Sequence, residues 1–264
     1  MAKYTFMNKM QSNFSISVIG AGNVAHSLVP ALLSKGYLID YVFSRNPQHA
    51  KKFAKNFDIK WTDNLNDLTG DIVIMAVTDS AIEQISAKLA MQSNQVIVHT
   101  AGSQPIDVIA KYHKHAGVLY PLQTFSVQRK VNFENLPVLI ETNSDYANKQ
   151  LSDIANNISS SVLQVNSNER LQIHTAAVFV CNFTNLMYTY GKDILDNHNL
   201  PFEVLKPLIK ETADKVLSNA PENMQTGPAV RNDKATLTRH INQLDADMAQ
   251  KYEQLSNWIK KRHS

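Results

Sequence analysis

A short loop of small residues constrains the fold of this chain most strongly. An apolar segment, residues 15–19, leads into Gly20-Ala21-Gly22-Asn23-Val24-Ala25, and an amphipathic segment over residues 24–33 follows. The first glycine permits a tight turn, the second lets the backbone approach a pyrophosphate, and the small alanine suits close packing of helix on sheet. Free N–H groups at the start of the helix would bind the phosphates. The loop predicts a dinucleotide-binding domain of the Rossmann type, and a tight turn that binds nothing is the alternative.

The remaining pattern extends this prediction to the whole chain. From Phe14 to about Val165, short apolar segments alternate with helix-like segments, which is typical of a parallel sheet. The predicted strands are residues 15–19, 41–44, 71–77, 95–99, 118–120, 137–141 and 162–165. Residues 72–77 are apolar without interruption and predict the central strand. Helical patterns follow over residues 169–197, 201–218 and 234–261. We therefore expect an α/β fold with a parallel-sheet Rossmann domain (residues 14–166) and an all-helical domain (residues 167–264).

Composition narrows the class of protein. With 44% hydrophobic and 19% charged residues, the 264-residue chain reads as an ordinary soluble globular protein. Its net charge is only +3 and its basic residues are scattered, so we expect no nucleic-acid partner.

No apolar stretch is long enough to cross a bilayer, and residues 1–13 lack the core of a signal peptide, so we expect no membrane partner. The single cysteine, Cys181, excludes an internal disulfide and points to the cytoplasm. His113 and His115 lack a third ligand at useful spacing, so no metal site is predicted.

The residues after the second predicted strand indicate which dinucleotide binds. An NAD enzyme usually presents a carboxylate to the ribose there, whereas this chain has Ser44, Arg45 and Asn46. The arginine is suited to pair with a 2′-phosphate, and its neighbours can donate hydrogen bonds to it. This segment predicts NADP, as NADPH, over NAD. A solvated surface arginine is the alternative.

Polar residues at other strand ends predict the rest of the cleft. Val77, Thr78 and Asp79 follow one strand, and the segment from His99 to Ala101 follows another. Open α/β sheets bind ligands at this edge, so we expect both segments on the nicotinamide side. The alternatives are a helix cap for Asp79 and a core histidine for His99. Gln123, beyond Tyr120-Pro121-Leu122, is a candidate substrate contact.

The candidate catalytic residues lie on the first predicted helix of the helical domain. At about 100° per residue, His174, Asn182 and Asn185 share one side of a regular helix. His174 is the candidate acid or base, because imidazole titrates close to neutral pH. Asn182 is a candidate to orient a carbonyl or the cofactor amide, and Asn185 a candidate substrate contact. A structural histidine with two amides at a domain contact is the alternative.

Two further candidates lie near the C-terminus. Arg231, in the irregular segment from Thr226 to Asp233, is placed to hold an anionic substrate, or alternatively to form a salt link with Asp233. His240, in the last helical region, is a weaker polar candidate for the substrate pocket.

Taken together, these motifs resemble a bacterial family of NADP oxidoreductases. The segments that carry the resemblance are residues 20–25, 99–103, 120–123, 174–185 and 226–233. Members of this family pair a Rossmann-like domain with a helical C-terminal domain of unknown function. More distantly, the chain resembles pyrroline-5-carboxylate reductase, ketopantoate reductase, 6-phosphogluconate dehydrogenase and the deazaflavin-dependent NADP reductases. The resemblance implies a helical domain like the C-terminal domain of 6-phosphogluconate dehydrogenase, and a homodimer formed through it.

One departure within the resemblance bears on the reaction. By the spacing of ketopantoate reductase, His174 stands at the catalytic lysine, Val178 at a first asparagine and Asn182 at a second. Because two of these three residues differ, a different acid or base, or a different substrate, is expected.

Two functions follow from the sequence. The first is an NADP-dependent oxidoreductase that transfers hydride between nicotinamide and a small carbonyl, imine or hydroxyl compound. The alternative is a non-catalytic dinucleotide-binding sensor or interaction protein. Cofactor turnover distinguishes the two.

Overall fold

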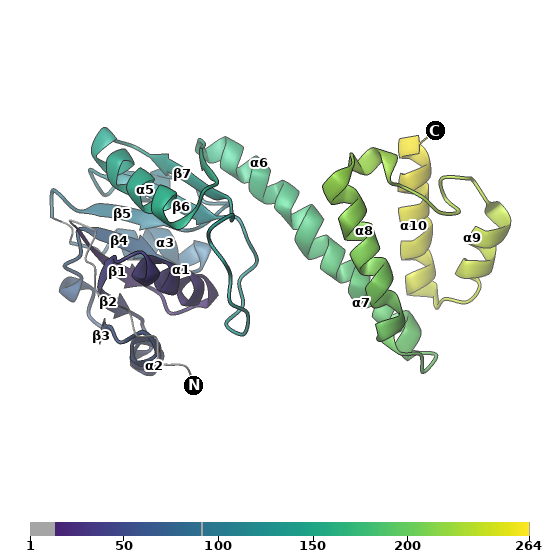
Figure 1. The fold of residues 1–264 in the computed structure, drawn as a ribbon, viewed down its shortest axis with the longest axis horizontal. Helices are drawn as coiled ribbons and strands as arrows, with labels where there is room; N and C mark the ends of the chain where they lie inside the picture. Colours follow the sequence, from purple (N-terminus) through teal and green to yellow (C-terminus); the bar gives the residue numbers. More distant parts are fainter. Residues whose placement is uncertain (1–13, 91, 264) are drawn as a thin grey trace. The chain divides into compact units, whose positions relative to one another are not determined.

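The computed structural model describes residues 14–90 and 92–263. Contacts within the chain define two compact units, one ending at Asn182 and the other spanning Phe183–Ser264. The first holds the whole sheet and the second is helical (Figure 1). This is the predicted fold class, a Rossmann-like N-terminal region followed by a helical C-terminal region.

The first unit is built on one eight-stranded sheet with the order β3-β2-β1-β4-β5-β6-β7-β8. The strands are β1 (Ser15–Ile19), β2 (Leu38–Phe43), β3 (Lys60–Thr62), β4 (Ile72–Met75), β5 (Val96–His99), β6 (Ala116–Pro121), β7 (Val138–Thr142) and β8 (Val162–Gln164). All four residues of β4 are fully buried, which confirms the predicted central strand. The strand order reverses between β1 and β4, and open α/β sheets bind their ligands at such a reversal.

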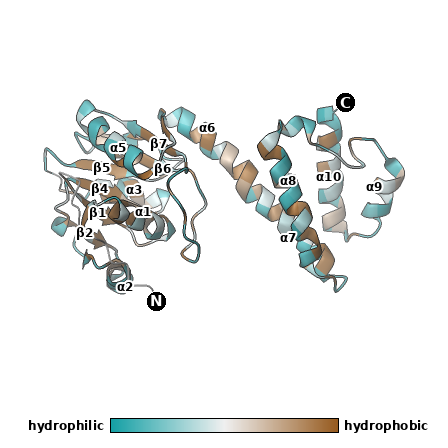
Figure 2. Cartoon of the chain, in the orientation of Figure 1, coloured by the Kyte–Doolittle hydropathy of each residue, from teal (hydrophilic) through white to brown (hydrophobic). Residues whose placement is uncertain are grey.

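Helices cover both faces of this sheet. The first unit contains α1 (Asn23–Ser34), α2 (Pro47–Phe57), η1 (Leu65–Asp67), α3 (Asp79–Ser86), α4 (Asp107–Ala110), α5 (Asp145–Ile158) and α6 (Ser167–Ala177). Ile72 and Ile74 of β4 belong to the core under α1 and α5, whereas Val73 and Met75 belong to the core under α3 and α4. Hydrophobic residues accordingly concentrate along the strands (Figure 2).

Two details of the sheet differ from the prediction. Strand β3 was not expected, because its three residues include Lys60 and the exposed Trp61. Strand β7 pairs antiparallel with β6, so the sheet is not parallel throughout. A parallel pair needs a crossover, usually a helix, and residues 122–137 between β6 and β7 form none.

The second unit consists of helices. They are α7 (Thr184–Asp196), η3 (Phe202–Leu205), α8 (Lys206–Ser218), η4 (Pro221–Asn223), α9 (Lys234–Ile241) and α10 (Ala246–His263). The predicted continuous helix over residues 234–261 was wrong, because the chain breaks between α9 and α10. The Asp245 carboxylate accepts a hydrogen bond from Met248 N at 2.9 Å, which caps a new helix there. Within the described residues, no helix has the length and apolarity that a membrane span requires.

A π-helical segment, η2 (Val178–Phe183), interrupts the predicted helix over residues 169–197. A π-helical turn contains more residues than an α-helical turn, so the spacing of 100° per residue does not hold across it. The argument that His174, Asn182 and Asn185 share one side assumed a regular α-helix. That geometric premise is therefore corrected. Short π segments of this kind occur frequently at functional sites.

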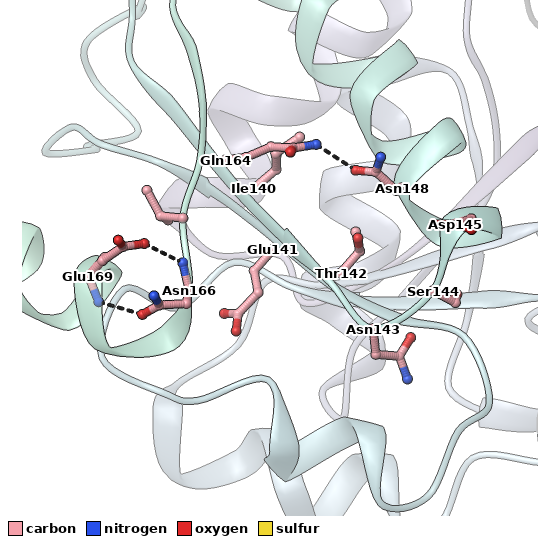
Figure 3. A pocket seen from close by; sticks show the side chains of 11 residues that line it. Ile140, Glu141, Thr142, Asn143, Ser144, Asp145, Asn148, Gln164, Asn166 and Glu169 are labelled. Atoms are coloured by element: carbon pink, nitrogen blue, oxygen red, sulfur yellow. Dashed lines mark hydrogen bonds between the residues drawn. The ribbon is translucent and has the colours of Figure 1, made fainter.

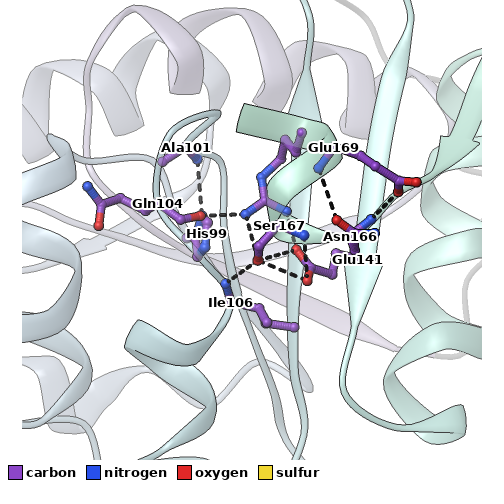
Figure 4. Close-up of polar contacts among 9 residues, drawn as sticks. His99, Ala101, Gln104, Ile106, Glu141, Asn166, Ser167 and Glu169 are labelled. Atoms are coloured by element: carbon purple, nitrogen blue, oxygen red, sulfur yellow. Dashed lines mark hydrogen bonds and ion pairs between the residues drawn. The ribbon is translucent and has the colours of Figure 1, made fainter. Parts of the chain in front are cut away.

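A buried charge network fixes the start of α6 on the sheet (Figure 4). The Arg170 side chain is fully buried and forms an ion pair with Glu141 of β7. It also donates a hydrogen bond to the Gln104 carbonyl, in the segment after β5. Ser167 Oγ accepts a hydrogen bond from Ile106 N at 3.0 Å. These contacts tie α6 to β7 and to the segment after β5.

We predict that Glu141→Ala destabilises the first unit by roughly 3–5 kcal/mol, because it leaves the Arg170 charge buried without a partner. Urea unfolding followed by Trp61 fluorescence, with Trp258→Phe as background, measures this change. The double variant Glu141→Leu with Arg170→Met should recover most of the loss. Lys111→Ala, which breaks an exposed pair with Glu83 in the same unit, is the control and should leave the urea midpoint almost unchanged. Equal losses in Glu141→Ala and the control would refute the structural role of the buried pair.

Candidate active site

A cleft of about 550 Å³ lies at the carboxyl ends of the strands around the reversal. The residues lining it come from three separate segments of the chain. They are Ile19, Gly20, Ala21, Gly22, Asn23 and Val24; Phe43, Ser44, Arg45, Asn46 and His49; and Ala76, Val77, Thr78, Ala81 and Ile85. The glycine loop, the segment around Arg45 and the end of β4 thus line one cleft.

The first two glycines of the loop serve different purposes. Gly20 has a φ of +110°, and a Cβ there would lie 2.2 Å from the Ala76 carbonyl oxygen. The fold itself therefore requires this glycine. Gly22 has a φ of −88°, and a Cβ there would meet nothing within 4 Å. Packing within the protein does not require a glycine at this position. The absence of a side chain at Gly22 instead leaves open space beside the N-terminus of α1.

That space lies at the N-terminus of α1. Gly22 is the N-cap residue, no side chain caps the helix, and its first turn holds no acidic residue. The first N–H groups of the helix are therefore left for another acceptor, and the helix dipole favours a negative one. This arrangement fits a dinucleotide pyrophosphate.

The Arg45 side chain also lines this cleft. It is exposed, and among the described residues it forms no ion pair. Asn46 has a structural role as well, because its side chain accepts hydrogen bonds from Gln48 N and His49 N and caps α2. Ser44 Oγ accepts a hydrogen bond from Asn46 N at 3.3 Å. Sequence reasoning missed His49, although its place one turn into a helix that starts beside Arg45 could have suggested it.

The segments after β4 and β5 are joined by side chains. Val77 and Thr78 line the cleft, and the Asp79 carboxylate accepts a hydrogen bond from the Ser103 hydroxyl. Asp79 thus bonds to a neighbouring loop and does not cap α3. Ala101, which is buried, does not line the cleft.

His99 is a core residue in this structure. Its side chain is fully buried, and its Nδ1 accepts a hydrogen bond from Ala101 N at 3.1 Å. Burial, helped by the nearby charge of Arg170, lowers the pKa of His99 to about 4. The imidazole is therefore neutral at pH 7, as the core-histidine alternative expects.

A tyrosine and a histidine meet at the same edge of the sheet. Tyr120, near the end of β6, and His174, on α6, form a hydrogen bond of 2.9 Å between Oη and Nδ1. The two rings pack edge to face with centroids 5.8 Å apart. Burial raises the pKa of the Tyr120 hydroxyl, and the nearby Asp79 charge raises it further, whereas Arg170 opposes the effect. Sequence reasoning placed Tyr120 at this edge without recognising it as the partner of His174.

Of the other candidates, Asn182 and Gln123 belong to the first unit. Asn182 is exposed in the π-helical segment, and Gln123 is exposed in a loop, where its Oε1 accepts a hydrogen bond from Thr124 N at 2.9 Å. Asn185, Arg231 and His240 belong to the second unit.

The surroundings of Arg231 and His240 within the second unit bear on their predicted roles. Arg231 is exposed, and among the described residues it forms no ion pair with Asp233. The hydrogen bond from Thr236 N lowers the pKa of the Asp233 carboxyl. His240 Nδ1 lies 2.7 Å from the hydroxyl of Tyr252.

A second cavity, of about 600 Å³, lies near the end of β7 and the starts of α5 and α6 (Figure 3). Two pairs of its polar residues bond to each other. Gln164 donates to Asn148 at 2.8 Å, and Asn166 and Glu169 form a reciprocal cap at the start of α6. Over the described part of the chain, no three His, Cys, Asp or Glu side chains gather as a metal site would need. The cleft at the glycine loop, with its open helix N-terminus, is therefore the better candidate site.

Comparisons with known proteins agree with this geometry. Residues 15–102 match the family described as NADP oxidoreductase coenzyme F420-dependent, and residues 136–259 match a domain of unknown function, DUF2520. A crystal structure from Bacteroides fragilis, provisionally described as an NADP oxidoreductase, is 39% identical, with a TM-score of 0.88, and covers 94% of this chain and 98% of its own. No curated protein shows significant similarity to the chain.

More distant structures share the fold. A protein from Thermotoga maritima is 19% identical with a TM-score of 0.73, and the match covers 94% of this chain and 98% of that one. An imine reductase from Myxococcus stipitatus, solved with NADP⁺, is 14% identical with a TM-score of 0.65 and coverage of 94% and 92%. The family match and the 39% identical structure define the class of NADP oxidoreductase-like proteins. Within it, the chain belongs to the family that joins the NADP oxidoreductase domain to DUF2520, as its motifs predicted.

The two glycines give a test of this local geometry. We predict that Gly20→Ala lowers the free energy of unfolding by at least about 2 kcal/mol, because the backbone is strained and the new Cβ meets the Ala76 carbonyl. Gly22→Ala should cost less than about 1 kcal/mol, the difference between the two residues at an N-cap. Urea unfolding of both variants measures the contrast. Similar losses would show that the loop has a different backbone conformation.

Proposed function

We propose that this protein is an NADP-dependent oxidoreductase that transfers hydride between nicotinamide and a small carbonyl, imine or hydroxyl compound. The observation that carries the proposal is the cleft lined by the open N-terminus of α1, the space above Gly22 and Arg45, which forms no ion pair with any described residue. When bound, the nicotinamide supplies or accepts the hydride. The protein contributes binding, orientation and a proton.

The positions of the cleft residues indicate which part of the cofactor each would bind. The loop from Gly20 to Val24 would hold the pyrophosphate, and Arg45 with Ser44 and Asn46 would hold the 2′-phosphate. Val77 and Thr78 would line the nicotinamide side. Asp79, His99 and Ala101 would support that side through the hydrogen bonds of their loops.

We propose that His174 supplies the proton that substrate reduction requires. Substrate reduction needs a proton as well as a hydride, and a histidine is suited to give it near neutral pH. Asn182 is the proposed residue that orients a carbonyl or the cofactor amide. Further proposed substrate contacts are Gln123, Asn185, Arg231 and His240.

The nucleotide preference is the first test of the proposal. We predict that NADPH binds at least about tenfold more tightly than NADH, a difference of about 1.4 kcal/mol, and that Arg45→Ala removes the preference. Nicotinamide fluorescence and thermal shift measure both affinities. Lys52→Ala, which removes an exposed charge from α2 outside the cleft, is the matched control and should keep the preference.

Gly22→Ala provides a second arm of this experiment. A methyl group would enter the space above α1, so we expect this variant to fold and to bind neither nucleotide tightly. If the unaltered protein binds neither nucleotide, the loop is only a structural turn and the proposal fails.

Turnover separates the enzyme from the non-catalytic sensor. We predict that His174→Gln lowers kcat by about 10² to 10⁴ and leaves the Kd for NADPH unchanged, because it removes the proton donor and not a cofactor contact. NADPH oxidation in a screen of carbonyl and imine compounds measures this. The screen includes a deazaflavin, because the family description names coenzyme F420. Tight NADPH binding with no turnover on any compound would favour the sensor.

We also propose that the protein is a homodimer that forms through its helical region. In the single chain, α7 and α8 contain no buried residue, and Leu208 and Val216, which share one side of α8, are 61% and 44% exposed. Amphipathic helices derive most of their stability from packing of the apolar face, so a partner surface is needed. A second copy of the chain is the partner we propose, and the lone Cys181 fits a reducing compartment such as the cytoplasm.

Light scattering tests the proposed dimer. We expect a mass of twice 29.6 kDa for the unaltered protein and a shift toward the single-chain mass for Leu208→Lys combined with Val216→Lys. Asp214→Lys, an exposed polar position on the opposite side of the same helix, should leave the mass unchanged. A single-chain mass for the unaltered protein at all concentrations would contradict the proposal.

A further inference from the structure

The contact between Tyr120 and His174 depends on a glycine. A Cβ at Gly102 would lie 2.7 Å from His174 Nδ1 and 2.7 Å from the Tyr120 ring carbon that bears the hydroxyl. Gly102 follows β5, so three separate segments of the first unit meet at this point. The absence of a side chain at residue 102 lets the other two approach within hydrogen-bond distance.

The charges around the pair favour one direction for its hydrogen bond. Asp79 is near enough to the Tyr120 hydroxyl to raise its pKa, as burial also does, so the phenol keeps its proton at neutral pH. When the imidazole carries two protons, Nδ1 donates to Oη, because the phenol keeps its own proton and its oxygen still has lone pairs. Arg170, which is ion-paired with Glu141, has a smaller and opposite effect on the Tyr120 pKa. The contact therefore occupies Nδ1 of the doubly protonated ring and leaves Nε2 to meet the substrate.

We propose that Tyr120 is a positioning residue that holds a proton on Nδ1 of His174 and thereby leaves Nε2 as the nitrogen that exchanges a proton with the substrate. This inference rests on the proposed function. It assigns to Tyr120 an effect exerted through His174, without contact with the reacting atoms.

The proton balance of the reaction follows from this arrangement. In reduction, the substrate carbon receives the hydride, and its oxygen or nitrogen receives the Nε2 proton of the doubly protonated imidazole. The Nε2–H bond breaks and an O–H or N–H bond forms. The ring becomes neutral and retains its Nδ1 proton, which it donates to Tyr120 Oη. In oxidation the same steps run in reverse, with neutral Nε2 as the base.

The tautomer of neutral His174 tests the inference directly. We expect ¹⁵N NMR of the unaltered protein, at a pH where the ring is neutral, to show the proton on Nδ1. The signals of His174 are assigned by their loss in His174→Gln. In Tyr120→Phe, which removes only the hydroxyl, the proton should move largely to Nε2. A proton on Nε2 in the unaltered protein, or a tautomer that Tyr120→Phe leaves unchanged, overturns the inference.

A second tyrosine–histidine pair in the chain provides the control. His240 and Tyr252 also contact each other through Nδ1 and Oη, at 2.7 Å, within the second unit. Tyr252→Phe should alter the ring signals of His240 and leave those of His174 unchanged. Gly102→Ala should shift the tautomer of His174 in the same direction as Tyr120→Phe, because the added Cβ separates the pair while both side chains remain.

Kinetics distinguishes failure of this inference from failure of the proposed function. We expect Tyr120→Phe to lower kcat by about 10-fold to 100-fold, a part of the typical gain from acid–base catalysis, with no change in the Kd for NADPH. Tyr112→Phe, an exposed position, should leave both unchanged. Normal kcat in Tyr120→Phe refutes the positioning role and leaves the oxidoreductase intact. The expected tautomers without any turnover support the positioning and refute the function.

Discussion

The close approach of the loop after β1 to the end of β4 determines where a ligand can bind. Gly20 N donates to Phe43 O and Ala76 N donates to Ile19 O, both at 2.8 Å, so the three central strands end at one level. Only a residue without Cβ fits against the Ala76 carbonyl at this point. The chain can then turn at once into α1, whose N-terminus opens into the cleft. The cleft, the exposed N–H groups and the position of Arg45 all depend on this contact.

A second constraint extends from the sheet to α6. Arg170 is buried against β7 and the segment after β5, and His174 lies one helical turn further along. Residues four apart lie on the same face of a helix, so the ion pair that fixes Arg170 also brings His174 against Tyr120. The buried charge is costly unless it is paired, which makes the position of this helix specific. A structural ion pair and a candidate catalytic residue thus share one helix face.

Local patterns were sufficient for some parts of the site and not for others. The loop from Gly20 to Val24 and the segment around Arg45 were predicted from consecutive residues, and both line the cleft. The direction of β7 was not predicted. It depends on the absence of a crossover helix between β6 and β7. His99 has the same strand-end position as the cleft residues, but its side chain points into the core. The break at η2 was missed because no proline or glycine marks it.

The sequence by itself determined the class of the fold, the family, and the loop on which dinucleotide binding is proposed. These properties follow from alternation of apolar segments and from glycines at fixed spacing, which act over a few neighbouring residues. Only the tertiary structure decided that Tyr120, Gly102 and His174 meet, and that Asp79 bonds to Ser103. These residues lie on separate segments of the chain. Their proximity is a consequence of strand order and of the buried anchoring of α6, which periodicity along the chain does not encode.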